Sequence, residues 1–200
     1  MTDKVDAGEA IEFFPVIRGT PIPPEPSDPW LEALQETRAS AEEKDRKLVI
    51  FAWSGDLDRV WPTLILATTS AAMGMQTTVF FTFWGLFPLV KNDVRLIGEN
   101  WMQKMLSLMN RGGTEHLKLS KMNFAGAGPA MMKRLARDHK VASPQELIEM
   151  AQEMGVRLVP CQMTMDLLGL GREDLIEGLE EPAGATSALL EAQDAITLFI

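Results

Sequence analysis

The stretch KLVIFAWSGDLDRVWPTLILATTSAAMGMQTTVFFTF, residues 47–83, decides the fold of this chain. It begins with an apolar run, 47–53, that is typical of a buried strand. Apolar residues then recur at the spacing of a helix, at Val60, Leu64, Ala67 and Ala71. Gly74 ends this helix, and the β-branched and aromatic run 77–83 predicts a second strand. Strand, helix and strand in this order predict a βαβ unit with a right-handed crossover.

The second half of the chain continues the alternation of helices and strands. SPQELIEMAQEMG, residues 143–155, predicts a helix with Ser143 as its N-cap. The strand VRLVP follows and leads into Cys161. Further patterns predict two short helical stretches, a helix and a last strand, at 162–170, 172–180, 187–195 and 196–200. The alternation predicts an open, mostly parallel α/β sheet with helices on both faces.

Residues 1–46 differ in composition from the rest of the chain. Five prolines between Pro21 and Pro29 predict an extended arm, and 30–46 reads as a polar helix that is either solvated or an oligomer contact. We therefore divide the chain into a proline-rich arm and polar helix, 1–46, and an α/β domain, 47–200.

Composition limits the possible functions. The chain has 200 residues, 46% of them hydrophobic, and its formal charge of −9 opposes binding to nucleic acid or to an anionic membrane surface. Its single cysteine makes an internal disulfide impossible, and its first residues do not resemble a signal peptide. These features predict a protein of the reducing cytoplasm.

One segment raises a different possibility. Residues 60–90 contain no Asp, Glu, Lys, Arg or His, and a helix of that length could span a bilayer. The middle of the segment, ATTSAAMGMQTT, is polar, however, and a buried helix followed by a buried strand fits the sequence better. We therefore expect no membrane association.

Ligands of open parallel sheets bind beyond the carboxyl ends of the strands. On the predicted fold, SGDLD (54–58), WGLFPLVK (84–91) and Cys161 converge at that edge. Cys161 precedes a predicted helix, whose amides and dipole favour a reactive thiolate. A buried, inert cysteine is an equally good interpretation on the residues alone.

A glycine-rich turn is a second candidate site. Gly126 and Gly128 precede a basic helix, and glycines there let helix amides approach an anion, or simply form a tight turn. The spacing is not that of the dinucleotide fingerprint. His116 and His139 are the only histidines and neither has metal-ligand spacing, so we expect no metal site.

Four blocks taken together resemble the DsrE/DsrF-like family, in the sulfur-trafficking branch with a CQMSMDLMG-type signature. They are SGDLD, VFFTFWGL, MNFAGAGPAMMK and CQMTMDLLGL, in this order. The resemblance covers about residues 47–200. It implies a flavodoxin-like fold, assembly into homo-oligomers, and a cysteine that accepts and passes on sulfur, which matches Cys161. It also implies partners such as TusA-like carriers, rhodaneses and heterodisulfide reductase-like complexes. Some relatives carry additional cysteines, which this chain lacks.

The leading hypothesis is a sulfurtransferase-like carrier, rather than a multiple-turnover enzyme, that holds sulfane sulfur or thiosulfate on Cys161 without a cofactor. Amides from Gln162 onward and the turn at Gly126 and Gly128 would stabilise the cargo. We also expect Trp84 to form an aromatic wall of the crevice. Three cationic side chains, Lys91, His116 and Lys121, are expected near it. The alternatives are a thiol peroxidase that uses Cys161 alone, and a non-catalytic oligomeric interaction protein with a structural cysteine.

Overall fold

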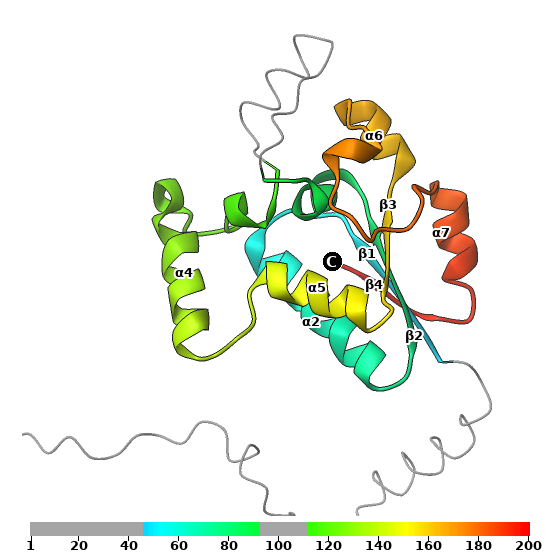
Figure 1. The fold of residues 1–200 in the computed structure, drawn as a ribbon, viewed down its shortest axis with the longest axis horizontal. Helices are drawn as coiled ribbons and strands as arrows, with labels where there is room; N and C mark the ends of the chain where they lie inside the picture. The colour runs from blue at the N-terminus through cyan, green and yellow to red at the C-terminus, as the bar shows by residue number, and fades with distance from the viewer. Residues whose placement is uncertain (1–45, 93–111) are drawn as a thin grey trace, which may run out of the picture. The chain divides into compact units, whose positions relative to one another are not determined.

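A sheet of four parallel strands forms the centre of the part of the chain that the structure describes (Figure 1). In this computed structural model the described residues are 46–92 and 112–200. The strands lie in the order β3-β2-β1-β4. Their bounds are Lys47–Ala52 for β1, Gln76–Phe81 for β2, Arg157–Pro160 for β3 and Ile196–Phe199 for β4. The predicted open parallel α/β sheet is confirmed.

Two helices cover one face of this sheet. α2 (Leu57–Ala72) and α5 (Pro144–Glu153) pack side by side there, and Figure 1 shows both on the same side of the strands. Their apolar stripes meet alternate residues of the strands in the main core, which includes Ile50, Leu64 and Leu158. α5 begins where expected, because Ser143 and Glu146 form a capping box with bonds of 3.3 and 2.7 Å.

The opposite face of the sheet is covered by the short helix α7 (Ala185–Glu191). Because side chains alternate along a strand, Phe80 and Val159 point to this face while their neighbours point to the main core. They form a second, smaller cluster with Cys161 and with Ala188 of α7. Helices therefore lie on both faces, as the sequence predicts.

The remaining elements are short or peripheral. α4 (Ala127–Asp138) follows the glycine-rich turn, and α6 (Gln162–Leu168) follows Cys161. Four 3₁₀ helices complete the described elements, at Phe83–Leu89, Thr114–His116, Phe124–Gly126 and Arg172–Asp174. The arm and polar helix expected in 1–46 lie outside the described residues, apart from Arg46.

Two expectations about local structure were wrong. The helical stretch expected at 172–180 is only the 3₁₀ turn Arg172–Asp174, because Leu175 is buried in the main core and forms an antiparallel bridge with Val90. The second strand ends at Phe81 rather than Phe83, since Phe83 has φ of 49°.

The uncharged segment 60–90 forms most of α2, then β2 and the 3₁₀ helix Phe83–Leu89. Within the ranges 46–92 and 112–200, none of the helices combines the length and the apolar character needed to cross a membrane.

Candidate functional site

A cavity of about 240 Å³ lies at the carboxyl ends of β1 and β2. It is lined by Trp53, Ser54, Gly55, Asp56, Trp84, Phe87, His116, Leu117 and Lys118. Two of the predicted segments, 54–58 and 84–91, therefore do converge there, and Trp84 and His116 face the same cavity. Trp84 stacks on Phe87 with ring centroids 5.7 Å apart. The cavity thus has an aromatic wall, and His116 and Lys118 are among its other lining residues.

Two glycines allow the segments after β1 and β2 to approach each other closely at this edge. A Cβ on Gly55 would collide with the backbone carbonyl of Trp84, and one on Gly85 would collide with the backbone carbonyl of Ala52. Gly85 also donates its amide to the carbonyl of Trp53 at 3.0 Å. The segments that follow β1 and β2 are therefore in direct backbone contact, and this contact sets the position of Trp84.

The loop that carries His116 is fixed to the first turn of α2. The amide of Leu57 donates to the carbonyl of Lys118 at 2.7 Å, and Ser120 donates its amide to Asp58 at 2.8 Å. The Ser120 hydroxyl donates to the other carboxylate oxygen of Asp58. Burial raises the pKa of Asp58, but the two hydrogen bonds from Ser120 outweigh it and the pKa lies below its usual value.

This bond predicts a pH-dependent contribution to stability. Because the pKa of Asp58 is lowered in the folded state, the contribution is complete above the unfolded pKa of about 3.9 and is lost as pH falls through the folded value. Asp58→Asn should cost about 1 kcal/mol or less near neutral pH, since the carboxylate is largely exposed. Urea unfolding of both proteins should give a difference that shrinks on acidification; a constant difference would contradict this role for Asp58.

Cys161 lies apart from this cavity. It is the N-cap residue of α6, and its amide donates to the carbonyl of Phe81 at the end of β2, at 2.9 Å. Its side chain belongs to the small cluster on the α7 face, and the residue is 2% exposed. The expectation that all three segments share one crevice is therefore met by two of them; Cys161 is at the same edge of the sheet but beneath α7.

The cover over Cys161 is held at two points. Ala183 forms a parallel bridge with Cys161, donating its amide to Pro160 and accepting a bond from the Gln162 amide, each at 3.0 Å. At the far end of α7, Glu191 pairs with Arg157 at 3.0 Å. Between these points Ala188 packs on the cluster that contains the thiol. Access to Cys161 therefore depends on α7 and the segment before it.

Thr164 is a buried residue of this region that sequence reasoning missed. Its hydroxyl lies 3.2 Å from the Thr82 hydroxyl and accepts a hydrogen bond of 3.1 Å from the Phe83 amide. It thereby links the first turn of α6, which follows Cys161, to the residues that follow β2. The last residue of β2 accepts the Cys161 amide bond. The only signal of Thr164 in the sequence was its place three residues after the cysteine. Trp53 and Lys118 were also missed as cavity residues.

The other predicted site residues are placed elsewhere. Lys91 donates to the carbonyl of Glu173 at 2.7 Å, and Lys121 is an exposed residue beside Ser120. Gly126 and Gly128 both donate their amides to the carbonyl of Asn123, at 2.8 and 3.3 Å. Besides its amide bond to Ala183, Gln162 donates from its side chain to Asp166 at 2.7 Å. These contacts are structural, and none of the five residues lines the cavity.

The chemistry available here is that of a buried thiol and, apart from it, of a cavity lined by aromatic and polar side chains. In the stretches 46–92 and 112–200, no three His, Cys, Asp or Glu side chains are grouped so that they could hold a metal ion. Arg59 lies over the Trp53 ring, 5.0 Å from its centroid, and adds a cation at the cavity wall. Cys161 is the single nucleophilic sulfur of the chain.

Comparison with known proteins gives a consistent family. The model of the DsrE/DsrF/DrsH-like family matches residues 44–199. The uncharacterized protein YrkE of Bacillus subtilis is 40% identical over 159 residues, which cover 79% of this chain and 99% of that protein. The sulfur carrier protein DsrE2 of Allochromatium vinosum is 36% identical over 160 residues, covering 78% and 99%.

A solved structure is also similar. It is that of a protein of unknown function from Methanobacterium thermoautotrophicum, with 14% sequence identity and a TM-score of 0.44, covering 78% of this chain and 100% of that one.

Proposed function

Because the chain belongs to the DsrE/DsrF/DrsH-like family, we propose that it is a sulfur carrier that holds its cargo covalently on Cys161. The relative named sulfur carrier protein DsrE2 supports a role in sulfur trafficking. The observation that carries the choice of residue is that the sole cysteine of the sequence follows β3, at the edge of the sheet where open parallel sheets bind their ligands.

The transfer of sulfane sulfur needs only the thiolate. Cys161 attacks the outer sulfur of a donor persulfide, so that Cys–S⁻ and R–S–SH give Cys–S–SH and R–S⁻. An acceptor thiolate then attacks the outer sulfur on Cys161 and leaves with it, which restores Cys–S⁻. Each step breaks one S–S bond and forms another, and there is no net oxidation. No cofactor enters either step.

Thiosulfate can be loaded by a similar thiolate attack when the donor is its oxidised form, tetrathionate. Cys161 attacks tetrathionate and forms Cys–S–S–SO₃⁻, while thiosulfate leaves. Tetrathionate is the oxidant in this step, so the thiol gains its cargo at the expense of the central S–S bond of the donor. A partner thiolate R–S⁻ then attacks the sulfur that bears the sulfonate, so that R–S–S–SO₃⁻ forms and Cys161 leaves as its thiolate. Both cargoes therefore require a thiol on another molecule, because this chain has no second cysteine.

Burial of the thiol adds a requirement to this proposal. Cys161 is 2% exposed beneath α7, so neither donor nor acceptor reaches it until α7 and the segment at Ala183 move. The cover is light: α7 has seven residues and buries Ala188 alone. A cover of this kind also protects a persulfide from water and small reductants between transfers. We expect the partners that open it to be thiol carriers of the TusA-like or rhodanese-like type.

Transfer to a thiol tests the proposal. Protein loaded with polysulfide and freed of excess reagent is mixed with reduced glutathione, and both products are followed by mass spectrometry. We expect the loaded form to return to the unmodified mass while glutathione persulfide appears. Release of sulfide with glutathione left on Cys161 as a mixed disulfide would mean that the outer sulfur is not passed on, and would contradict carriage.

The same burial favours a second candidate function, a non-catalytic protein in which Cys161 fills the small cluster with Phe80 and Val159. The two candidates differ in one measurable respect. A carrier opens in the native state and reacts with small sulfur donors, whereas a structural cysteine reacts only when the whole domain unfolds. Loading measured at increasing urea concentrations below the unfolding transition separates them: only a carrier is loaded without denaturant.

A further inference from the structure

α4 presents its apolar stripe to solvent rather than to the domain. Met131, Met132 and Leu135 are 72%, 42% and 53% exposed, and Pro129 is the helix's single buried residue. The opposite side of the helix faces the domain, where Ala136 packs against the main core. In an ordinary surface helix this orientation is reversed. Met122 and Phe124, in the turn that leads into α4, are 68% and 69% exposed, and we group all five side chains as the apolar part of the α4 surface.

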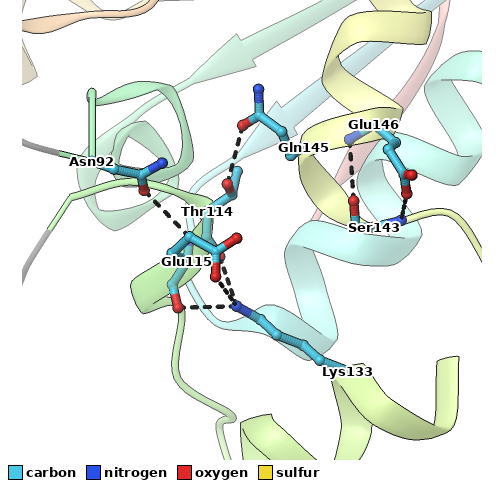
Figure 2. A network of polar contacts seen from close by, with 7 residues as sticks. All are labelled: Asn92, Thr114, Glu115, Lys133, Ser143, Gln145 and Glu146. Atoms are coloured by element: carbon cyan, nitrogen blue, oxygen red, sulfur yellow. Dashed lines mark hydrogen bonds and ion pairs between the residues drawn. The ribbon is translucent and has the colours of Figure 1, made fainter. Parts of the chain in front are cut away.

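Hydrogen bonds and an ion pair from Lys133 hold α4 in this orientation. Lys133 reaches from α4 to the loop before it and donates to the carbonyls of Thr114 and Glu115, at 3.2 and 2.9 Å (Figure 2). It also pairs with the Glu115 carboxylate at 3.6 Å. Thr114 is itself buried and donates to Gln145 at the start of α5. The side of α4 that carries Lys133 is thus bound to the domain, and the methionines lie on the other side.

The charges around this surface indicate which kind of partner surface fits it. Residues 118–140 contain six lysines and arginines and one aspartate, in a chain whose net charge is −9. Arg134 is exposed and, three residues after Met131, borders the α4 stripe. Two α4 helices from different copies would therefore repel each other. The surface that fits α4 is apolar at its centre and acidic at its rim.

The chain itself carries such a surface on the other face of the sheet. Leu189 and Leu190 of α7 are 63% and 60% exposed, and residues 173–194 contain seven acidic and no basic residues. Glu181 and Asp194, which flank α7, are both exposed. Because α4 packs on the face with the main core and α7 on the face with Cys161, the two surfaces of one copy do not meet. They can meet between two copies.

From these observations we propose that copies of this chain assemble head to tail, with the α4 surface (Met122, Phe124, Met131, Met132, Leu135 and Arg134) on the α7 surface (Leu189, Leu190, Glu181 and Asp194) of the next copy. One contact then covers both exposed apolar surfaces with matching charges. An anionic membrane would also attract α4, but it would leave the α7 leucines exposed and would be repelled by the rest of the chain. A head-to-tail contact closes into a ring or continues as a filament.

This arrangement would bring the neighbour's α4 next to the helix that covers Cys161. It does not depend on sulfur chemistry, so Cys161→Ser should assemble like the unmodified protein. The proposed carrier function can accordingly fail while the assembly is found, and the reverse.

Mixing two variants of the full chain tests the head-to-tail contact. The α4 variant carries Met131→Asp with Arg134→Glu, and the α7 variant carries Leu189→Lys with Glu181→Lys; all four positions are exposed. Sedimentation velocity should show the unmodified protein as an oligomer that weakens as salt rises to about 0.5 M. Each variant alone should be monomeric. An equimolar mixture should form a dimer, since one α4 surface and one α7 surface remain intact.

A control variant on α5 and the results that would overturn the proposal complete the test. Met150→Asp with Glu153→Lys, a comparable exposed pair on α5, should leave the oligomer unchanged. The proposal is overturned by a monomeric unmodified protein, by variants as oligomeric as the unmodified protein, or by a mixture that stays monomeric. Circular dichroism establishes that each variant is folded. Co-sedimentation of a monomeric protein with phosphatidylglycerol vesicles, but not with phosphatidylcholine vesicles, would identify a membrane as the occupant instead.

Discussion

Alkylation of Cys161 by iodoacetamide is expected to be at least about 100-fold slower in the native protein than in the unfolded chain, because the thiol is buried beneath α7. A factor of this size corresponds to a local opening free energy of about 2.7 kcal/mol. Ala188→Asp places a carboxylate in the cluster around Cys161 and should favour the open cover. We expect it to raise the native alkylation rate at least about 10-fold.

A neighbouring position supplies the control for this experiment. Ser187 lies on the same helix and is exposed, so Ser187→Asp adds the same charge outside the cluster and should change the rate by less than about two-fold. Circular dichroism and urea unfolding establish that Ala188→Asp is still folded. Equal rates in both variants, or fast alkylation of the unmodified native protein, would show that α7 does not limit access to the thiol.

Gly85→Ala is expected to have the largest effect on stability among single-methyl additions at the carboxyl edge of the sheet. Its Cβ would lie 2.6 Å from the carbonyl carbon of Ala52 and still closer to the oxygen, and neither backbone atom can rotate away. Because Gly85 also donates to Trp53 and Thr82, the turn resists shifting. We expect a loss of about 2–3 kcal/mol in the free energy of unfolding, or more, together with a displaced Trp84.

The same substitution at an open position is the comparison. Gly184 has no heavy atom within 4 Å of an added Cβ and has φ of −87°, so Gly184→Ala should change stability by less than about 1 kcal/mol. Urea unfolding followed by tryptophan fluorescence measures both variants and reports on the environment of Trp84. Similar unfolding free energies for the two variants would show that β1 and β2 are not joined by this backbone contact.

Those parts of the fold that depend on short-range patterns could be predicted from the sequence. β1 and β2 are apolar runs, and α5 has Ser143 and Glu146 at capping-box spacing, so burial and local hydrogen bonds both specify these elements. The order of elements then made a parallel sheet the natural arrangement. The edge-of-sheet rule in turn placed Trp84 at this crevice. His116 was expected near it as a loop residue, and it lines the same cavity.

Features that depend on long-range contacts could not be predicted in this way. Residues 172–180 have helical spacing, but Leu175 pairs with Val90, which lies 85 positions earlier, so tertiary pairing overrides the local pattern. The local sequence also does not determine where a lysine side chain points. Lys91 was expected near the crevice, but its ammonium group donates to the carbonyl of Glu173. The burial of Cys161 depends on Ala183 and Ala188, residues with no distinctive signal of their own.

Intact-mass spectrometry of the native protein tests the central proposal, sulfur carriage on Cys161, most directly. Protein incubated with polysulfide or tetrathionate and then freed of reagent should gain about 32 Da or about 112 Da, and Cys161→Ser treated in parallel should gain neither. Cys161 is the single thiol of the chain, so the site needs no further mapping. Unmodified protein after both treatments, or the same mass gain in Cys161→Ser, would contradict the account.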